Sequence, residues 1–367
     1  MKKILLVFSI VFLTMLSVFA ENEPIIMPSQ TGIVSRVEYV DFGNQDNIQT
    51  KQVAEIKLLG GDYRGTFVTV DNMLTGNPYY DIRLKKGTKV VLHVEDDNGE
   101  YIYSIEDVKR SDVLLLMAVL FCGLLVYVGR KKGLFSLVSI TLTCLLIYYI
   151  LSPMILHGIN PLCSTVLICL ISTSITMYMV GGLNKKSTSA ILGCILSLII
   201  AGFLSFLTVK FASLTGFINE NSVFLYTAHP ELNFVHITIS MIVLATLGAV
   251  MDVGMSIAST INEIYMLDNN KTVFELFQSG MNVGRDIIGT MANTLILVYV
   301  GGALPLLLLS SNIDMQKFLN LNQVVTEIAS ALIGSIAIVI CVPITAFVAS
   351  ELVRKKHTDI DFSNLKN

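Results

Sequence analysis

The chain has 367 residues, of which 53% are hydrophobic and only 14% are charged, and its formal net charge is −3. Because a soluble globular protein carries about 25% charged residues, this composition excludes a disordered chain, a disulfide scaffold and an ordinary cytosolic enzyme. It favours a polytopic membrane protein with one soluble domain, since the charged residues crowd into residues 21–112 and then thin to short clusters between long apolar runs. The small net charge and the lack of a continuous basic stripe give no reason to expect nucleic acid as a partner.

The N-terminus has the pattern of a secretory signal. Lys2 and Lys3 precede an apolar segment over residues 4–19, and Ala20 ends a small-residue cleavage site. We therefore predict a signal peptide over residues 1–20, with an uncleaved membrane anchor as the alternative. Both interpretations place the residues that follow outside the cytoplasm.

Residues 27–110 are expected to form an extracytoplasmic β domain. Short, partly alternating segments are separated by turn sequences such as Gly60-Gly61-Asp62 and Asp97-Asn98-Gly99. Five or six strands in a domain of this size predict a small barrel, OB-like or SH3-like. All six cysteines lie in apolar runs outside this domain, so no disulfide is expected in it. The expected strands cover residues 33–40, 52–59, 64–70, 82–85, 89–94 and 101–105.

Seven apolar runs then predict a transmembrane helical bundle over residues 112–351, followed by a cytoplasmic tail over residues 352–367. Most runs reach the roughly 20 residues that a bilayer requires. Basic clusters fall in alternate connections, so the positive-inside rule places the β domain outside and the C-terminus in the cytoplasm. The seven runs are residues 113–129, 134–152, 161–182, 188–209, 234–258, 286–309 and 324–350.

The cytoplasmic loop between the fifth and sixth runs carries a helix-start signal. Thr272 and Glu275 have the spacing of a capping box, and an apolar stripe follows them. This pattern predicts a short interfacial helix that ends near Gly280. The sixth span is then expected to begin at Asp286.

Polar side chains share one face of the fifth expected span, and others share one face of the sixth, because they recur at intervals of three or four residues. Ionisable groups inside a span cost about 2.5–3.5 kcal/mol each on insertion scales, so they normally face the bundle interior or water. We predict that these side chains form a polar layer in the inner half of the membrane. The candidate residues are Asp252, Ser256, Arg285, Asp286, Thr290 and Asn293.

Three interpretations of this layer are open. Arg285 could form a structural ion pair with Asp252 or with Asp286, the layer could be a polar pathway or an ion-coupled site, or the two aspartates could form an intramembrane protease pair. The sequences around the aspartates differ from those of aspartyl membrane proteases, and an adjacent arginine tends to keep Asp286 ionised. Zinc-protease, nucleophile-elbow and phosphate-loop motifs are also missing from the sequence. We therefore expect no enzymatic activity, no catalytic residue, no metal site and no cofactor.

Several segments of the chain resemble the YibE/F-like family of bacterial membrane proteins. They are Gly-Gly-Asp-Tyr-Arg-Gly at 60–65, Val-Gly-Arg-Lys-Lys-Gly at 128–133, His-Gly-Ile-Asn-Pro at 157–161, and residues 247–259 and 279–297 around the polar layer. The resemblance implies a multi-pass protein of the bacterial cell membrane, in a family sometimes supposed to contain permeases. It implies no substrate and no catalytic residues.

The expected function is secondary transport or permeation of a small solute or ion across the lipid bilayer. The alternative is a non-transporting scaffold or envelope assembly factor, whose outer β domain binds a protein partner. A homo-oligomer, or a hetero-oligomer with a related membrane protein, is compatible with either function.

Overall fold

The computed structural model describes residues 29–45, 48–60, 63–97 and 100–354. The predicted signal segment and nearly all of the predicted cytoplasmic tail lie outside these residues. The chain divides into two compact units, and the boundary between them falls after Leu124.

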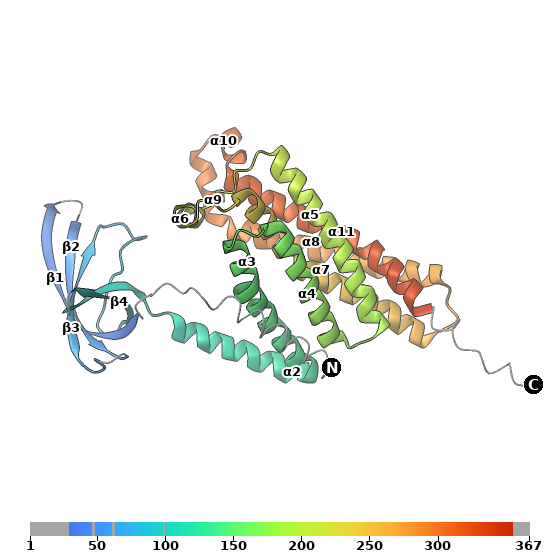
Figure 1. Ribbon diagram of the computed structural model, residues 1–367, viewed down its shortest axis with the longest axis horizontal. Coiled ribbons are helices and arrows are strands. Elements are labelled where there is room, and N and C mark those ends of the chain that lie inside the picture. Colours follow the sequence, from blue (N-terminus) through green and yellow to red (C-terminus); the bar gives the residue numbers. More distant parts are fainter. Residues whose placement is uncertain (1–28, 46–47, 61–62, 98–99, 355–367) are drawn as a thin grey trace, which may run out of the picture. The chain divides into compact units, whose positions relative to one another are not determined.

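The first unit contains a nearly closed, antiparallel barrel of five strands (Figure 1). The strands are β1 (Gln30–Gln45), β2 (Ile48–Leu58), β3 (Phe67–Leu74), β4 (Lys89–Asp97) and β5 (Glu100–Val108). They lie in the order β3-β2-β1-β4-β5, so the long strand β1 pairs with both β2 and β4. The small β-barrel predicted from the sequence is therefore confirmed, and its strands are antiparallel.

Alternate residues of the strands fill the barrel. Val34, Ala54, Ile56 and Leu92 are fully buried in one apolar cluster, as expected where one face of each strand points to the core. Gly32 lies so close to Ile56 that a side chain at this position would collide with it. The close approach of Gly32 in β1 to the Ile56 side chain of β2 therefore requires a glycine.

The strand predicted over residues 82–85 is wrong, because residues 75–88 connect β3 to β4 without a strand. Leu84 is nevertheless buried, and its backbone bonds to a side chain instead of to another strand. Its N–H donates to Oε1 of Gln52 at 3.0 Å, and Nε2 of Gln52 donates to the Leu84 carbonyl at 3.2 Å. The apolar pattern of this segment thus indicated burial correctly and strand pairing incorrectly.

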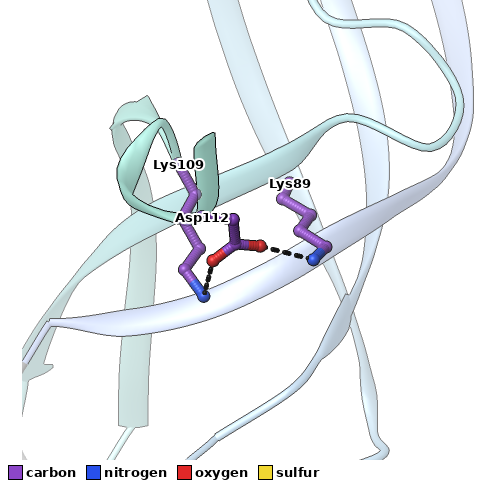
Figure 2. A network of polar contacts seen from close by, with 3 residues as sticks. All are labelled: Lys89, Lys109 and Asp112. Atoms are coloured by element: carbon purple, nitrogen blue, oxygen red, sulfur yellow. Dashed lines mark hydrogen bonds and ion pairs between the residues drawn. The ribbon is translucent and has the colours of Figure 1, made fainter. Parts of the chain in front are cut away.

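Ion pairs fix the first turn of helix α2 (Ser111–Leu146) to the barrel (Figure 2). Figure 2 shows the Asp112 carboxylate between two lysines, Lys89 at the start of β4 and Lys109 just after β5. The two Nζ–Oδ distances are 2.6 Å and 3.0 Å. An acidic residue in the first turn also suits the positive end of the helix dipole, so charge supports this junction in two ways.

The rest of the described chain is helical. Six helical segments in it are long and apolar enough to cross a membrane. Beyond α2, the elements are η1 (Ile147–Leu151), α3 (Ser152–Leu156), α4 (Pro161–Gly181), α5 (Lys185–Phe211), α6 (Glu220–Ala228), α7 (Phe234–Leu267), α8 (Val273–Gly302), α9 (Leu304–Leu309), η2 (Ser310–Asn312), α10 (Met315–Leu319) and α11 (Asn322–Arg354).

The first of the six segments, Ser111–Leu156, has 46 residues. As a straight helix it would measure about 69 Å, more than twice the roughly 30 Å of a hydrocarbon core. It breaks at Arg130, whose φ of 49° and ψ of −129° are not helical. Gly133 then packs directly on the backbone carbonyl of Leu125. The segment therefore consists of two helices, and these correspond to the first two apolar runs of the sequence.

Helices α5, α7 and α11 form the packed centre of the second unit, with α4 and α8 beside them (Figure 1). Half of the most apolar stretch of each central helix is buried, against 6% for α8. Glycines allow the close approach: Gly193 of α5 packs on Thr345 of α11, and Gly254 of α7 packs on Cys194 of α5.

The capping box predicted at the start of α8 is present. The N–H of Glu275 donates to Oγ1 of Thr272 at 3.2 Å, and Oε2 of Glu275 accepts from the Thr272 N–H at 2.7 Å. Both pairs satisfy N–H groups that would otherwise lack a partner at a helix end.

The short interfacial helix ending near Gly280 is wrong, because α8 continues without interruption to Gly302. Gly280 packs against Ile261 of α7, and Gly284 packs against Val342 of α11. These glycines therefore serve helix contact and do not end the helix. As a result, the Arg-Asp pair at 285–286 lies in the fourth turn of α8 instead of at its start.

Candidate functional site

The six residues of the predicted polar layer all have exposed side chains on the outward faces of two helices. Asp252 and Ser256 lie on α7, and the other four lie on α8. The opposite faces of both helices are buried, through residues such as Val253 and Ile257 of α7 and Gly284 of α8. The sequence left two environments possible for these side chains, the bundle interior and water. In the described chain they do not face the packed interior of the bundle.

Packing contacts place the six residues at similar heights along the helix axes. Gly284 of α8 lies level with Ile257 of α7, which it contacts. At 1.5 Å per residue, Asp252 is about 7.5 Å from that level and Asn293 is about 13.5 Å from it, in the same direction. Ser256 and Arg285 are each one residue, about 1.5 Å, from that level on the same side, so the whole layer spans about 12 Å along the helices.

The same contacts show that the layer is not at the end of the helical unit. Gly284 also packs on Val342 of α11, which precedes Arg354 by twelve residues. That separation is about 18 Å of helix. The charged pair at 285–286 therefore lies well inside the length of the bundle, deeper than its place in the apolar run suggested.

The two hydroxyl members of the layer bond to their own helices. Oγ of Ser256 donates to the Asp252 carbonyl at 2.8 Å, and Oγ1 of Thr290 donates to the Ile287 carbonyl at 3.1 Å. Such bonds to a carbonyl one turn earlier are common for Ser and Thr in helices. These hydroxyls are therefore satisfied without any further partner.

The charged and amide members are not satisfied in this way. Nη1 of Arg285 donates to Oδ1 of Asn282 at 3.0 Å. Within the described part of the chain, Arg285 makes no ion pair with Asp252 or Asp286, and the side chains of Asp252, Asp286 and Asn293 make no hydrogen bond. The structural ion pair considered from the sequence is thus not formed among these residues.

The layer offers carboxylates and an amide to a solute, and no built metal centre. Among the residues that the structure describes, no group of three or more His, Cys, Asp and Glu side chains could hold a metal ion. Two carboxylates and one guanidinium leave a formal charge of −1 in the layer, which suits a cation or a polar solute with a cationic group.

Comparison with known protein families accounts for most of the chain. The family model described as "YibE/F-like protein" matches residues 117–355, and the family model described as "YibE/F family N-terminal domain" matches residues 23–108. The chain belongs to the YibE/F-like family. No curated protein and no solved structure gives a significant match.

In this YibE/F-like chain the two family regions follow the two parts of the structure. The N-terminal match ends at Val108, the last residue of β5, and the second match begins within α2. The polar layer lies entirely in the second region. The resemblance inferred from the segments at 247–259 and 279–297 is therefore confirmed at the level of the family.

The sequence reasoning missed two polar residues of the helical unit. Asn282, the hydrogen-bond partner of Arg285, lies one turn before the polar layer on α8. Glu327 of α11 is half-buried and lines an apolar cavity of about 260 Å³ together with Tyr299 of α8. An acidic residue three positions into the last apolar run was the signal that could have identified Glu327.

Proposed function

We propose that this YibE/F-like protein is a permease of the bacterial cytoplasmic membrane that moves a small solute or ion. The barrel then lies outside the cytoplasm and the C-terminus inside, because this orientation puts the basic clusters of the sequence on the cytoplasmic side. The six long apolar helical segments support the membrane location. The proposal assigns no catalytic residue and no cofactor.

The observation that carries the proposal is the set of polar side chains without partners at 252, 286 and 293. Ionisable groups within a span cost about 2.5–3.5 kcal/mol each and usually mark a solute or ion pathway. A purely structural role would require partners, and the described residues offer none to Asp252 or Asp286. We therefore place the pathway along the outward faces of α7 and α8.

Flux measurements in liposomes test this proposal. The purified full-length protein is reconstituted and assayed with monovalent cations, divalent cations and small amine-bearing solutes. D252N and N293A are each expected to retain expression and insertion and to lose flux about tenfold or more, equivalent to about 1.4 kcal/mol in the barrier. If both variants leave flux intact, the polar-layer mechanism is wrong.

The chain offers a matched control for D252N. Glu263 is another exposed carboxylate on α7, three turns closer to the cytoplasmic end and outside the polar layer. E263Q removes one negative charge from the same helix and is expected to keep wild-type flux. An equal loss in E263Q would mean that the assay reports net charge instead of a pathway.

A scaffold function is the second candidate, and aromatic side chains on the barrel surface favour it. Tyr79 and Tyr80 are 75% and 65% exposed, and the rings of Tyr63 and Tyr101 lie 5.5 Å apart on the same unit. Exposed aromatic residues are typical of protein-binding surfaces. Absence of flux for every solute in intact, protein-containing liposomes would make this the better function.

A further inference from the structure

The outward face of α8 is polar along several turns and is not covered by any described part of its own unit. We name this face the α8 stripe, and its exposed residues are Asn282, Arg285, Asp286, Gly289, Thr290 and Asn293. At Gly289 the space is open, since a side-chain carbon there would meet no atom within 4 Å. The stripe is therefore accessible to another helix.

The two charges of the stripe lie on opposite flanks. Successive residues of a helix are about 100° apart, and the buried Gly280 and Gly284 mark the side of α8 that faces the bundle. On this basis Gly289 is on the midline of the outward face, and Arg285 and Asp286 lie on either side of it. The flanks thus carry opposite charges at nearly the same height.

This arrangement is complementary to itself. A two-fold axis parallel to the helix brings each flank of α8 against the opposite flank of a second α8, as e and g positions meet in parallel coiled coils. Arg285 then faces the partner's Asp286, and Asp286 faces the partner's Arg285. Both pairs form at one height because the residues are consecutive, and Gly289 on the midline permits close helix approach.

Another segment of this chain would serve less well as the cover. The first part of α2 is exposed and apolar, but residues 113–129 contain no charged side chain. It could cover the midline of the stripe and would leave both charges unpaired. Only an occupant with both charges on opposite flanks satisfies Arg285 and Asp286 together.

We propose that the protein forms a two-fold dimer through the α8 stripe, in which reciprocal ion pairs of Arg285 and Asp286 join the two copies. The partner copy supplies the charges that the described chain does not. This inference goes beyond permeation and does not depend on it, because it stands on exposure and charge alone. In the dimer, Arg285, Asp286, Thr290 and Asn293 of the polar layer lie in the interface, whereas Asp252 and Ser256 lie on the neighbouring helix α7.

Charge-reversal variants test the proposed ion pairs between the two copies. R285D leaves two acidic flanks on α8, and D286R leaves two basic flanks, so each variant repels itself and attracts the other. Full-length protein carrying two different affinity tags is co-expressed and purified through both tags in lipid nanodiscs. Wild type is expected to co-purify with wild type, each variant is expected to lose co-purification with itself at least tenfold, and R285D with D286R is expected to recover it.

The outcomes of this experiment are distinct. Self-association of both variants at the wild-type level would overturn the proposal, and so would failure of R285D to pair with D286R when both are inserted. K317D reverses a charge on α10, outside the α8 stripe, and is expected to co-purify as wild type does. All readouts are of association, so a failed flux assay leaves the dimer test unaffected.

A steric test covers the case in which the charge variants do not insert. Gly289 and Gly301 lie on the same helix, and a Cβ added at either would meet no atom within 4 Å. G289W should therefore be compatible with the monomer fold but wedge the dimer apart, whereas G301W, off the midline, should leave the dimer intact. Co-purification of G289W equal to that of G301W would overturn the proposal. A wild-type protein that is a stable monomer, with α2 covering position 289, would overturn it as well.

Discussion

Helices α11 and α8 are neighbours that carry similar numbers of polar residues and use them differently. On α11 the inward hydroxyls of Ser330 and Ser350 donate to carbonyls of their own helix at 2.8 Å and 2.7 Å and are buried. On α8 the guanidinium, carboxylate and amide groups of the stripe point away from the bundle. A hydroxyl can be satisfied by its own helix, whereas a charge or an amide requires a partner.

The charged and amide residues of an apolar helix are therefore more informative about function than its hydroxyl residues. Ser and Thr in such helices are compatible with a plain structural role. Asp, Arg and Asn are costly unless something outside the helix meets them.

The largest expected effect is at the contact between α5 and α11. Gly193 packs directly on Thr345, whose Cα would lie 3.0 Å from an added Cβ. G193A should lower the free energy of unfolding by about 1–3 kcal/mol, because backbone and side chain must move apart. Thermal unfolding in detergent measures this loss.

Gly248 of α7 provides the matched control for G193A. An added Cβ there would meet no atom within 4 Å, so G248A should be neutral or stabilising by up to about 1 kcal/mol through helix propensity. Equal destabilisation by the two variants would contradict the distinction between the packed centre and the outward faces.

In the barrel, the buried amide of Gln52 finds its partners in other segments of the chain, unlike the hydroxyls of α11. It is fully buried, exchanges two hydrogen bonds with the Leu84 backbone and accepts a third from Nδ2 of Asn72 at 3.0 Å. Q52A should destabilise the barrel by about 1–3 kcal/mol, because it leaves buried donors and an acceptor unpaired. Urea unfolding of residues 27–110, a segment with its own apolar core, measures this loss of stability. Lys57 is exposed on the same strand, and K57A should change the free energy of unfolding by less than about 0.5 kcal/mol.

Sequence periodicity was sufficient to predict the barrel and the apolar helices, because burial repeats every two residues in strands and every three or four in helices. It failed at Leu84, whose burial depends on a side-chain amide 32 residues earlier in the chain. It also failed at Gly280, because a helix-ending glycine and a helix-packing glycine have the same composition signal.

The polar layer was only partly predictable for a related reason. Spacing identified the shared faces of Asp252 with Ser256 and of Asp286 with Asn293. Which face turns inward depends on where other helices pack, and the glycines at 280 and 284, spaced by four, were the available sign that α8 contacts its neighbours on the opposite side.

The smallest expected effect concerns the loop before β4. Burial acts to raise the pKa of Asp81, but hydrogen bonds from Thr75 and from the N–H of Gly76 at 2.8 Å outweigh it and hold the pKa below its usual value, which is about 3.9. Because the folded pKa is lowered, the carboxylate stabilises the loop above the unfolded pKa and loses this contribution as the pH falls through the folded pKa. Amide NMR shifts of Thr75 and Gly76 should report that titration, and D81N should abolish it; shifts that follow an unperturbed aspartate would contradict the hydrogen-bonded loop.

In the proposed dimer, a second copy covers the polar face of α8. Single-molecule photobleaching of wild-type protein, labelled once per chain on a C-terminal tag and reconstituted at low density in liposomes, tests it most directly. Most labelled particles should bleach in two steps, and G289W should shift them to one step while G301W should not. One-step bleaching of the wild type at every lipid-to-protein ratio would contradict it.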